Sequence, residues 1–414
     1  MPAENSPSPK RSVLPPSFAR LAWSNLAAQS AEQIALSAAP IVAVLALGAR
    51  EAETGMLQTL LTLPFLVFAI PAGVLADRAP RRLLMAGAEA VRAVSLVALV
   101  AMLQFGMLTW QWLGAIGFVA VCGTIAFSVA APSLIPALVP ASGLPAANAR
   151  IELARTVAFT AGPAVGGVLV GWIGGEAAFA AAAALSVVAV ILLAGLNEPP
   201  RQIVKRHIVH DILEGAAFVF RNPLLAPVFV CQLIYNTSYF LTLAIFVPYA
   251  VHDLGLSAGG VGATIGMTGA GMVVGALLAP RLIALIPFGS VIAIGPLGGV
   301  SSSVLLAMTA VWPSPILAAF SFFVLGVCSI LWVISTTTLR QTIVPHHLLG
   351  RVSSIHIMAF SARPFGSAIG ALIGGLYGAK VCLVAATVGF AIQATWMLMS
   401  PTVRLRSQPA MAGI

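Results

Sequence analysis

The chain has 414 residues, of which 59% are hydrophobic and 8% charged, and its mean hydropathy is +1.01. Soluble proteins carry about 25% charged residues, so this composition excludes a water-soluble enzyme, and it equally excludes disorder and the weak alternation of a membrane β-barrel. The net charge of +9 comes from basic residues that stand singly between apolar blocks, so we expect no nucleic-acid partner.

Long apolar blocks dominate the chain from its first quarter to its end. A helix needs about 20 apolar residues to cross a bilayer, because all backbone polar groups must be satisfied inside the helix. Twelve such blocks predict an all-α integral membrane protein with twelve transmembrane helices. The predicted spans are residues 21–47, 55–76, 83–104, 110–131, 151–173, 177–196, 224–250, 260–286, 288–311, 315–338, 354–378 and 380–399.

The distribution of Lys and Arg predicts the orientation of these spans. With the amino terminus in the cytoplasm, 16 of the 21 basic residues fall in cytoplasmic segments, as the positive-inside rule requires. We therefore expect a bacterial-type inner (plasma) membrane protein with both termini cytoplasmic. The predicted organisation is a disordered tail (1–17), an N-terminal six-helix bundle (18–196), a cytoplasmic linker (197–222), a C-terminal six-helix bundle (223–400) and a tail (401–414).

Two interpretations of the linker stay open, a short amphipathic helix on the membrane surface and a solvated connection. The cysteines give no metal or disulfide signal, because none of Cys122, Cys231, Cys328 and Cys382 stands in a CxxC or Cys/His spacing. We expect no metal and no cofactor. A phosphate-binding GxxxxGK[ST] loop is also missing from the sequence, which argues against ATP as the direct energy source.

Two spacings recur between the halves of the chain and predict an internal duplication. Polar residues on one face of the first span, Asn25, Gln29 and Glu32, recur 207 positions later as Gln232, Asn236 and Tyr239. Glycines of the fifth span, Gly162, Gly166 and Gly171, recur 204 positions later as Gly366, Gly370 and Gly375. The agreement of the two shifts favours duplication over chance.

The stretch GVLADRAPRR follows the second predicted span. It resembles the signature loop of the major facilitator superfamily and keeps Gly73, Asp77, Arg78, Arg81 and Arg82, while Pro80 replaces a glycine. The resemblance implies that Asp77 bonds to the cytoplasmic amino end of the eleventh span, where the helix dipole and Arg351 favour a carboxylate. The alternative is an ordinary charged cytoplasmic turn.

The stretch AFTAGPAVGG, Ala158–Gly167, is similar to the motif of exporters in this superfamily. Gly162, Gly166 and Gly167 at this spacing allow two helices to approach closely, and Pro163 removes a backbone donor and permits a bend. The resemblance implies antiport, whereas the alternative is ordinary tight helix packing.

A third stretch, FSVAAPSLIPALVPASGLPAANA, covers residues 127–149. It is similar to the connection after the fourth span in the branch of enterobactin exporters, macrolide efflux proteins and transmembrane secretion effectors. The resemblance implies two pseudo-symmetric six-helix bundles (the major facilitator fold) that work as a monomer, and it does not name a substrate.

Glu32 is the sharpest candidate for function, because charge inside a bilayer is costly and marks functional sites. It shares a helix face with Asn25 and Gln29, and the resemblance implies that the first and seventh helices line a central cavity. We hypothesise that Glu32 carries the proton or contacts the substrate. The alternative is a permanent structural pair with Arg155 or Arg363.

Other polar residues inside spans are further candidates. Gln232, Asn236, Tyr239 and Arg363 are expected near the substrate, and Tyr235, Trp332 and His356 are weaker candidates for the cavity wall or a proton relay. The pairs Glu89–Arg92 and Glu152–Arg155 have helical spacing. They lie in cytoplasmic halves of their spans, where the side chains can extend toward the aqueous surface, and we interpret them mainly as gate or packing charges.

The sequence as a whole predicts a secondary active transporter and not an enzyme. The predicted activity is proton-coupled export of small apolar or amphipathic molecules of the drug, macrolide or siderophore type, by alternating access. Its partners would be the small-molecule substrate, protons and the lipid bilayer. Alternatives are an importer of the same fold, a membrane enzyme or a regulator, although the six histidines form no catalytic cluster.

Overall fold

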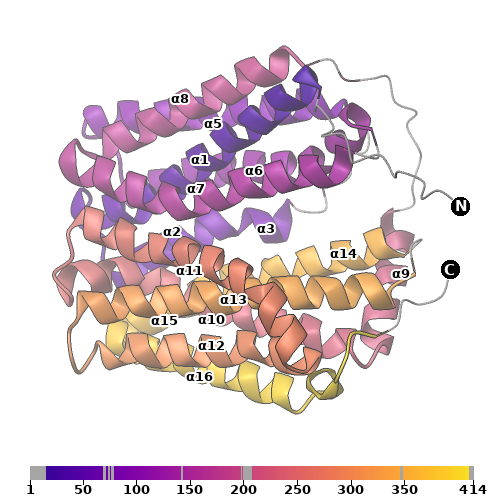
Figure 1. Cartoon of the computed structure of the whole chain (residues 1–414). Coiled ribbons are helices and arrows are strands. Elements are labelled where there is room, and N and C mark those ends of the chain that lie inside the picture. Colours follow the sequence, from indigo (N-terminus) through magenta and orange to yellow (C-terminus); the bar gives the residue numbers. More distant parts are fainter. Residues whose placement is uncertain are drawn as a thin grey trace, which may run out of the picture.

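The computed structural model describes residues 15–68, 71–72, 75, 79–140, 143–196, 198, 208–345 and 348–409. These residues are helices and short connections arranged as two stacked bundles (Figure 1). The first bundle holds α1 (Pro16–Leu45), α2 (Glu51–Thr62), α3 (Pro64–Val67), α5 (Arg81–Gln104), α6 (Trp110–Leu138), α7 (Leu144–Trp172) and α8 (Gly175–Ala194).

The second bundle follows the helix α9 (Ile208–Arg221), which lies within the predicted linker. It holds α10 (Leu225–His252), α11 (Ala258–Leu285), α12 (Phe288–Met308), α13 (Pro315–Ile343), α14 (Leu349–Met358), η2 (Ala359–Ala362), α15 (Arg363–Tyr377), α16 (Ala379–Leu398) and η3 (Pro401–Arg404). The start of α1 and the end of α16 lie on the same side of the molecule (Figure 1). We call the helix ends on that side inner ends and the opposite ones outer ends.

Eleven helices of the described residues are long and apolar enough to cross a membrane. The predicted count of twelve is not shown, because the second predicted span, 55–76, corresponds to two shorter helices, α2 and α3, and to residues that lie partly outside the described ranges. Pro64 begins α3 and has no amide hydrogen to continue the ladder of α2. The twelfth span therefore stays a prediction.

The eleventh predicted span is also interrupted. Residues 359–362 form the 3₁₀ turn η2 between α14 and α15, immediately before Arg363 and Pro364. A proline at this position cannot donate the next helical hydrogen bond. The stretch Leu349–Tyr377 still counts as one of the eleven spans, so the predicted span is confirmed and the 3₁₀ turn is a local feature within it.

Both predicted tails are shorter than expected. Helix α1 begins at Pro16, inside the segment predicted as a tail, and residues 1–14 lie outside the described part of the chain. At the other end, η3 packs against α12, where the amide of Gly289 donates a 2.8 Å hydrogen bond to the carbonyl of Leu405. Thr402 is fully buried at the same place.

The backbone carries the duplication that the sequence predicts. Glycines with positive φ end equivalent helices: Gly48 (φ 68°) follows α1 and Gly255 (φ 66°) follows α10, and their spacing is again 207 residues. Gly174 (φ 116°) and Gly378 (φ 82°) precede α8 and α16 at the second shift of 204 residues. Only glycine adopts these conformations without strain, so the turns are repeated elements.

The glycines of α7 pack against two different helices. A Cβ atom added at Gly162 or Gly166 would collide with Gln33 or Ser37 of α1, in the same bundle. A Cβ at Gly167 would lie 2.5 Å from a backbone oxygen of α11, in the other bundle. Helix α7 continues through Pro163 without interruption, so the residue does not break it.

The glycines of α15 repeat this arrangement in the second bundle. Gly366 and Gly370 face α10 of the same bundle, and Gly375 faces α2 of the other bundle, where its added Cβ would lie 2.8 Å from the Cβ of Ala52. The bundles thus meet along two equivalent pairs of helices, α7 with α11 and α2 with α15. A shared apolar cluster that includes Ile41 and Leu254 joins them near the outer ends.

Candidate functional site

A buried arginine ties three helices of the first bundle together. Arg92 of α5 donates to Glu89 Oε1 (2.6 Å), to the carbonyl of Ala28 on α1 (3.1 Å) and to the hydroxyl of Thr124 on α6. The side chains of Arg92 and Glu89 are 3% and 0% exposed. The pair is therefore held inside the bundle by its partners and does not extend to the aqueous surface, which agrees with its interpretation as packing charges.

Glu32 stands next to this network. In an α-helix the carbonyl of Ala28 lies one turn before Glu32 on the same face, so Arg92 reaches α1 just below the Glu32 side chain. Glu32 is half-buried, and within the described residues its carboxylate makes no ion pair or hydrogen bond. The permanent pair with Arg155 or Arg363 that the sequence left open is absent among these residues.

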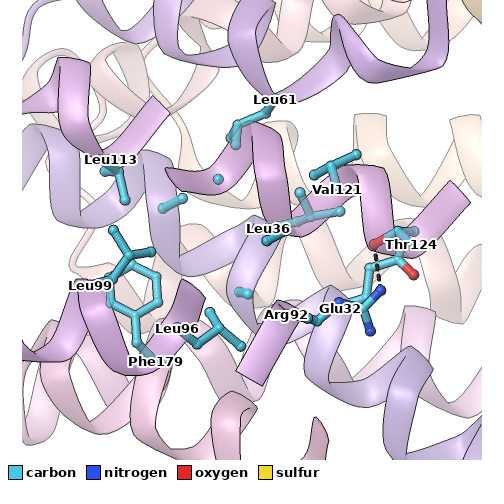
Figure 2. A pocket seen from close by; sticks show the side chains of 14 residues that line it. Glu32, Leu36, Leu61, Arg92, Leu96, Leu99, Leu113, Val121, Thr124 and Phe179 are labelled. Carbon is cyan, nitrogen blue, oxygen red and sulfur yellow. Dashed lines mark hydrogen bonds between the residues drawn. The ribbon is translucent and has the colours of Figure 1, made fainter. Parts of the chain in front are cut away.

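A small cavity adjoins Glu32 inside the first bundle. It has a volume of about 40 Å³ and is lined by α1, α2, α5, α6 and α8. Figure 2 shows Glu32, Arg92 and Thr124 at one end of it and Leu99 and Leu113 at the other. Its lining is otherwise apolar, so the polar groups are confined to one end.

The other two polar residues of the first span lie closer to the inner end. Asn25 is 3% exposed, and its Oδ1 atom is buried without a hydrogen-bond partner among the described residues. Gln29 is half-buried, as Glu32 is. Asn25, Gln29 and Glu32 thus lie on one face of α1, as predicted. Asn25, nearest the inner end, is buried, whereas Gln29 and Glu32 are half-buried.

Arg363 is the central charge of the second bundle and has an aromatic environment. Its guanidinium carbon lies 4.1 Å from the ring centre of Phe360, 4.5 Å from that of Phe65 and 5.1 Å from that of Phe240. Its Nε donates to Asn236 Oδ1 at 3.3 Å. Phe65 belongs to α3, so this cage of aromatic rings joins the two bundles.

The remaining predicted residues of α10 bond within the second bundle. Gln232 Oε1 lies 3.2 Å from Nδ1 of His356 on α14, and Tyr239 stacks on Tyr235 with ring centres 5.8 Å apart. Trp332 packs against α12 at Gly295. Gln232, Asn236, Tyr239 and Arg363 therefore lie along one group of contacts between α10, α14 and α15.

The signature loop is only partly described. Gly73, Asp77 and Arg78 lie outside the described residues. Glu198 accepts hydrogen bonds from the amides of Arg81 (3.2 Å) and Arg82 (2.9 Å) at the start of α5, where a carboxylate complements the helix dipole. The Arg82 guanidinium in turn donates to the carbonyl of Leu196 at 2.9 Å, so these residues connect α5 to the end of α8.

Arg351 has a partner on the linker helix. It forms an ion pair with Glu214 of α9, and Val219 of α9 is fully buried against α14. Residues 208–221 of the linker are helical, and this helix packs on the second bundle. Its predicted position on the membrane surface stays a prediction. The expected bond between Asp77 and the amino end of α14 is an untested prediction.

Sequence reasoning missed the two groups that surround the candidate charges. The spacing of Glu89 and Arg92 was visible, but their burial depends on Ala28 and Thr124 from other helices. The aromatic cage gave no signal, because phenylalanines are common in apolar spans. Only the placement of Arg363 within a span pointed toward it.

The structure is thus that of a multi-pass membrane protein built from two related helix bundles, with buried polar groups between and within them. A family model of the Major Facilitator Superfamily matches residues 21–371. The chain belongs to this superfamily, whose members are transporters, and its function class is secondary transport.

Relatives and solved structures agree with this assignment. An uncharacterised MFS-type transporter of Sinorhizobium fredii is 30% identical over 282 residues, which is 63% of this chain and 67% of that protein. The D-xylose–proton symporter has a TM-score of 0.73 at 13% identity, covering 94% of this chain and 99% of that one. A bacterial homologue of the lysosomal transporter Spinster, in an inward-facing conformation, has a TM-score of 0.73 at 14% identity, covering 94% and 97%. These structural likenesses show the fold alone.

Proposed function

We propose that the protein exports small apolar or amphipathic molecules, of the drug, macrolide or siderophore type, in exchange for protons. The observation that carries the proposal is Glu32, a half-buried carboxylate in the middle of a membrane-spanning helix that pairs with no cation among the described residues. Such a group is held at a high energetic cost and is a functional site by default. Glu32 is accordingly the proposed proton carrier.

The contacts between the bundles support alternating access. Close glycine contacts join α7 to α11 from Thr160 outward, and α2 to α15 near Ala52 and Gly375. The inner part of α7 is open, since Leu153 is 63% exposed and the side chains of Glu152 and Arg155 are 56% and 40% exposed. We infer a conformation in which the outer ends of the two bundles are closed. Rocking of the bundles against each other would open the outer ends.

The proposed substrate contacts lie in the second bundle. Asn236 donates to the carbonyl of Gln232 at 2.8 Å and accepts from Arg363. Tyr239 contacts the ring of Phe240, over which the Arg363 guanidinium lies. Aromatic side chains provide apolar area with polar groups nearby. Gly73, Asp77, Arg78, Arg81, Arg82 and Arg351 are the proposed gate residues. The domain boundaries at 196 and 222, the monomeric state and the cytoplasmic position of both termini belong to the same proposal.

Export is favoured by the motif around Gly162, Pro163, Gly166 and Gly167 and by the resemblance of residues 127–149 to an efflux branch. The alternative is uptake by the same fold, because the D-xylose–proton symporter shares it. Direction is therefore the first property to test.

Inverted membrane vesicles separate the two directions. A proton-coupled exporter concentrates its substrate inside such vesicles when their lumen is acidified, and an importer does not. The substrate is first found by comparing accumulation of dyes, antibiotics and siderophore-like compounds in cells with and without the protein. Glu32→Gln, expressed at the same level, is expected to abolish the accumulation that depends on the pH gradient; full retention of it would remove Glu32 as the proton carrier.

A further inference from the structure

The cavity beside Glu32 has a polar end and an apolar end. Glu32, Arg92 and Thr124 line one end, and Leu99, Leu113 and Phe179 line the other (Figure 2). All lining residues belong to the first bundle. The cavity is therefore separate from the boundary at which the two bundles meet.

The cavity is large enough to hydrate the carboxylate. A water molecule needs roughly 10–15 Å³ and two to four polar partners, and this cavity offers about 40 Å³. Partners exist only at the end that holds Glu32, Arg92 and Thr124. Because the half-buried Glu32 carboxylate makes no hydrogen bond within the described residues, a water molecule at this end would supply a hydrogen bond that the protein does not provide.

The apolar end points toward the outer side of the molecule. Leu113 lies in the first turn of α6 and Phe179 in the second turn of α8, both of which start at the outer side, and Leu99 lies near the outer end of α5. Leu99, Leu113 and Phe179 are 3%, 0% and 1% exposed. These three buried side chains line the outer end of the cavity.

We propose that this cavity is the route by which protons reach Glu32 from the outer side, separate from the substrate path, with Leu99, Leu113 and Phe179 as its apolar gate. The inference rests on the proposed role of Glu32 as proton carrier. A hydronium ion that passes the gate transfers its proton to a Glu32 carboxylate oxygen and leaves a water molecule in the cavity. The same proton leaves later toward the inner side.

The charges around Glu32 fit this exchange. Arg92 lines the same end of the cavity as Glu32 and donates to the carbonyl of Ala28, one turn before Glu32. Arg92 forms its ion pair with Glu89 at 2.6 Å. Of these two carboxylates, Glu32 is therefore the one that forms no ion pair among the described residues.

The test measures proton exchange at Glu32 without a transported substrate. Purified full-length protein in liposomes is moved from H₂O to D₂O, and the infrared carbonyl band that Glu32→Gln removes is followed in time. Ala120→Leu fills the cavity from α6, and Leu113→Ala opens the gate. Ala180→Leu, the same change at an exposed position of α8, is the matched control.

We expect Ala120→Leu to slow exchange by about tenfold or more, a rise of roughly 1.4 kcal/mol in the barrier, and Leu113→Ala to accelerate it. Exchange that equals the Ala180→Leu control in both variants would overturn the proposed route and leave Glu32 as the carrier. A protein in which Glu32→Gln removes no band at any pH would instead contradict the carrier role itself.

Discussion

The N-terminal bundle buries the charged pair Glu89–Arg92 behind α1, whereas the C-terminal bundle places Arg363 at the boundary with the other bundle. Glu89 and Arg92 are enclosed between α1, α5 and α6. Arg363 instead contacts Phe65 across the boundary, at 4.5 Å. The two halves share their main helix contacts and their glycine turns, but they differ in the placement of these polar side chains.

This difference indicates that the two duplicated halves have different functions: proton coupling in the N-terminal bundle and substrate binding in the C-terminal bundle. Glycines that set the distance between helices recur at matching positions, because a larger side chain would collide with the neighbouring helix. The polar positions of α1 and α10 have no such constraint. They carry a carboxylate beside a cavity in one half, and amide and aromatic groups that hold a guanidinium in the other.

The largest expected effect comes from removing the buried cation. Arg92→Met leaves Glu89 as an uncompensated buried charge, so we expect a loss of about 3–5 kcal/mol in stability. Thermal unfolding of the purified protein measures it. The double variant Glu89→Gln/Arg92→Met is expected to recover most of the loss.

Arg155→Met is the matched control for that experiment. Its pair with Glu152 is exposed, at 40% and 56%, so its removal is expected to cost less than about 1 kcal/mol. Equal losses for Arg92→Met and Arg155→Met would show that the enclosed charges of the first bundle are no different from surface charges.

Next in size are the glycines at which the bundles meet. The Cβ atom of Gly167→Ala would lie 2.5 Å from the carbonyl oxygen of Ala258, and that of Gly55→Ala 2.5 Å from Cα of Ala371. Both changes should separate the outer ends at a cost of about 1–3 kcal/mol. Cross-linking yield between cysteines placed at the outer ends of α7 and α11, or of α2 and α15, measures the separation.

Gly87→Ala controls for the substitution itself, since nothing lies within 4 Å of its added Cβ. Its cross-linking yield should match that of the unmodified protein. Because the duplication makes the two joints equivalent, a loss at Gly167 without one at Gly55 would contradict the equivalence.

A smaller effect is expected from the aromatic cage. In a double-mutant cycle of Phe360→Leu with Arg363→Met, the coupling energy in unfolding should be about 0.5–2 kcal/mol, the range of a cation–π contact. Phe365, which is 56% exposed on the next turn, provides the control pair. Coupling as small for Phe360 as for Phe365 would mean that the cage does not hold Arg363.

The smallest effect concerns the linker helix. Glu214→Gln removes an ion pair whose side chains are 33% and 38% exposed, so its cost should stay below about 1 kcal/mol. Val219→Ala, which deletes methyl groups from a fully buried position, should cost more. The free energies of unfolding of the two variants show whether apolar packing or charge contributes more to the attachment of α9 to α14. A larger loss of stability in Glu214→Gln than in Val219→Ala would contradict this prediction.

Much of the fold follows from the sequence, because span length and backbone geometry leave local signals. Blocks of apolar residues located eleven helices, and the shifts of 207 and 204 residues predicted a duplication whose repeated glycine turns, such as Gly48 and Gly255, only the structure shows. The 3₁₀ turn before Arg363 and the division of the second span at Pro64 were not predicted. Both proline positions were visible, but a proline in a membrane helix does not always interrupt it, as Pro163 shows.

The site was less predictable, because its contacts join distant parts of the chain. Glu32 and Arg363 were singled out as charges inside spans, and that logic needs no structure. The burial of Arg92 depends on acceptors from α1 and α6, and the cage around Arg363 needs a ring from the other bundle. Such combinations carry no spacing pattern that a sequence could show.

This difference in function between the two bundles is tested most directly by two transport measurements on Glu32→Gln in proteoliposomes, with a substrate identified by the accumulation screen. Counterflow exchanges substrate for substrate and needs no net proton movement, whereas concentrative transport driven by a pH gradient does. We predict that Glu32→Gln retains counterflow and loses gradient-driven concentration. Loss of both activities, or retention of both, in a stably folded variant would contradict the assignment of proton coupling to the N-terminal bundle.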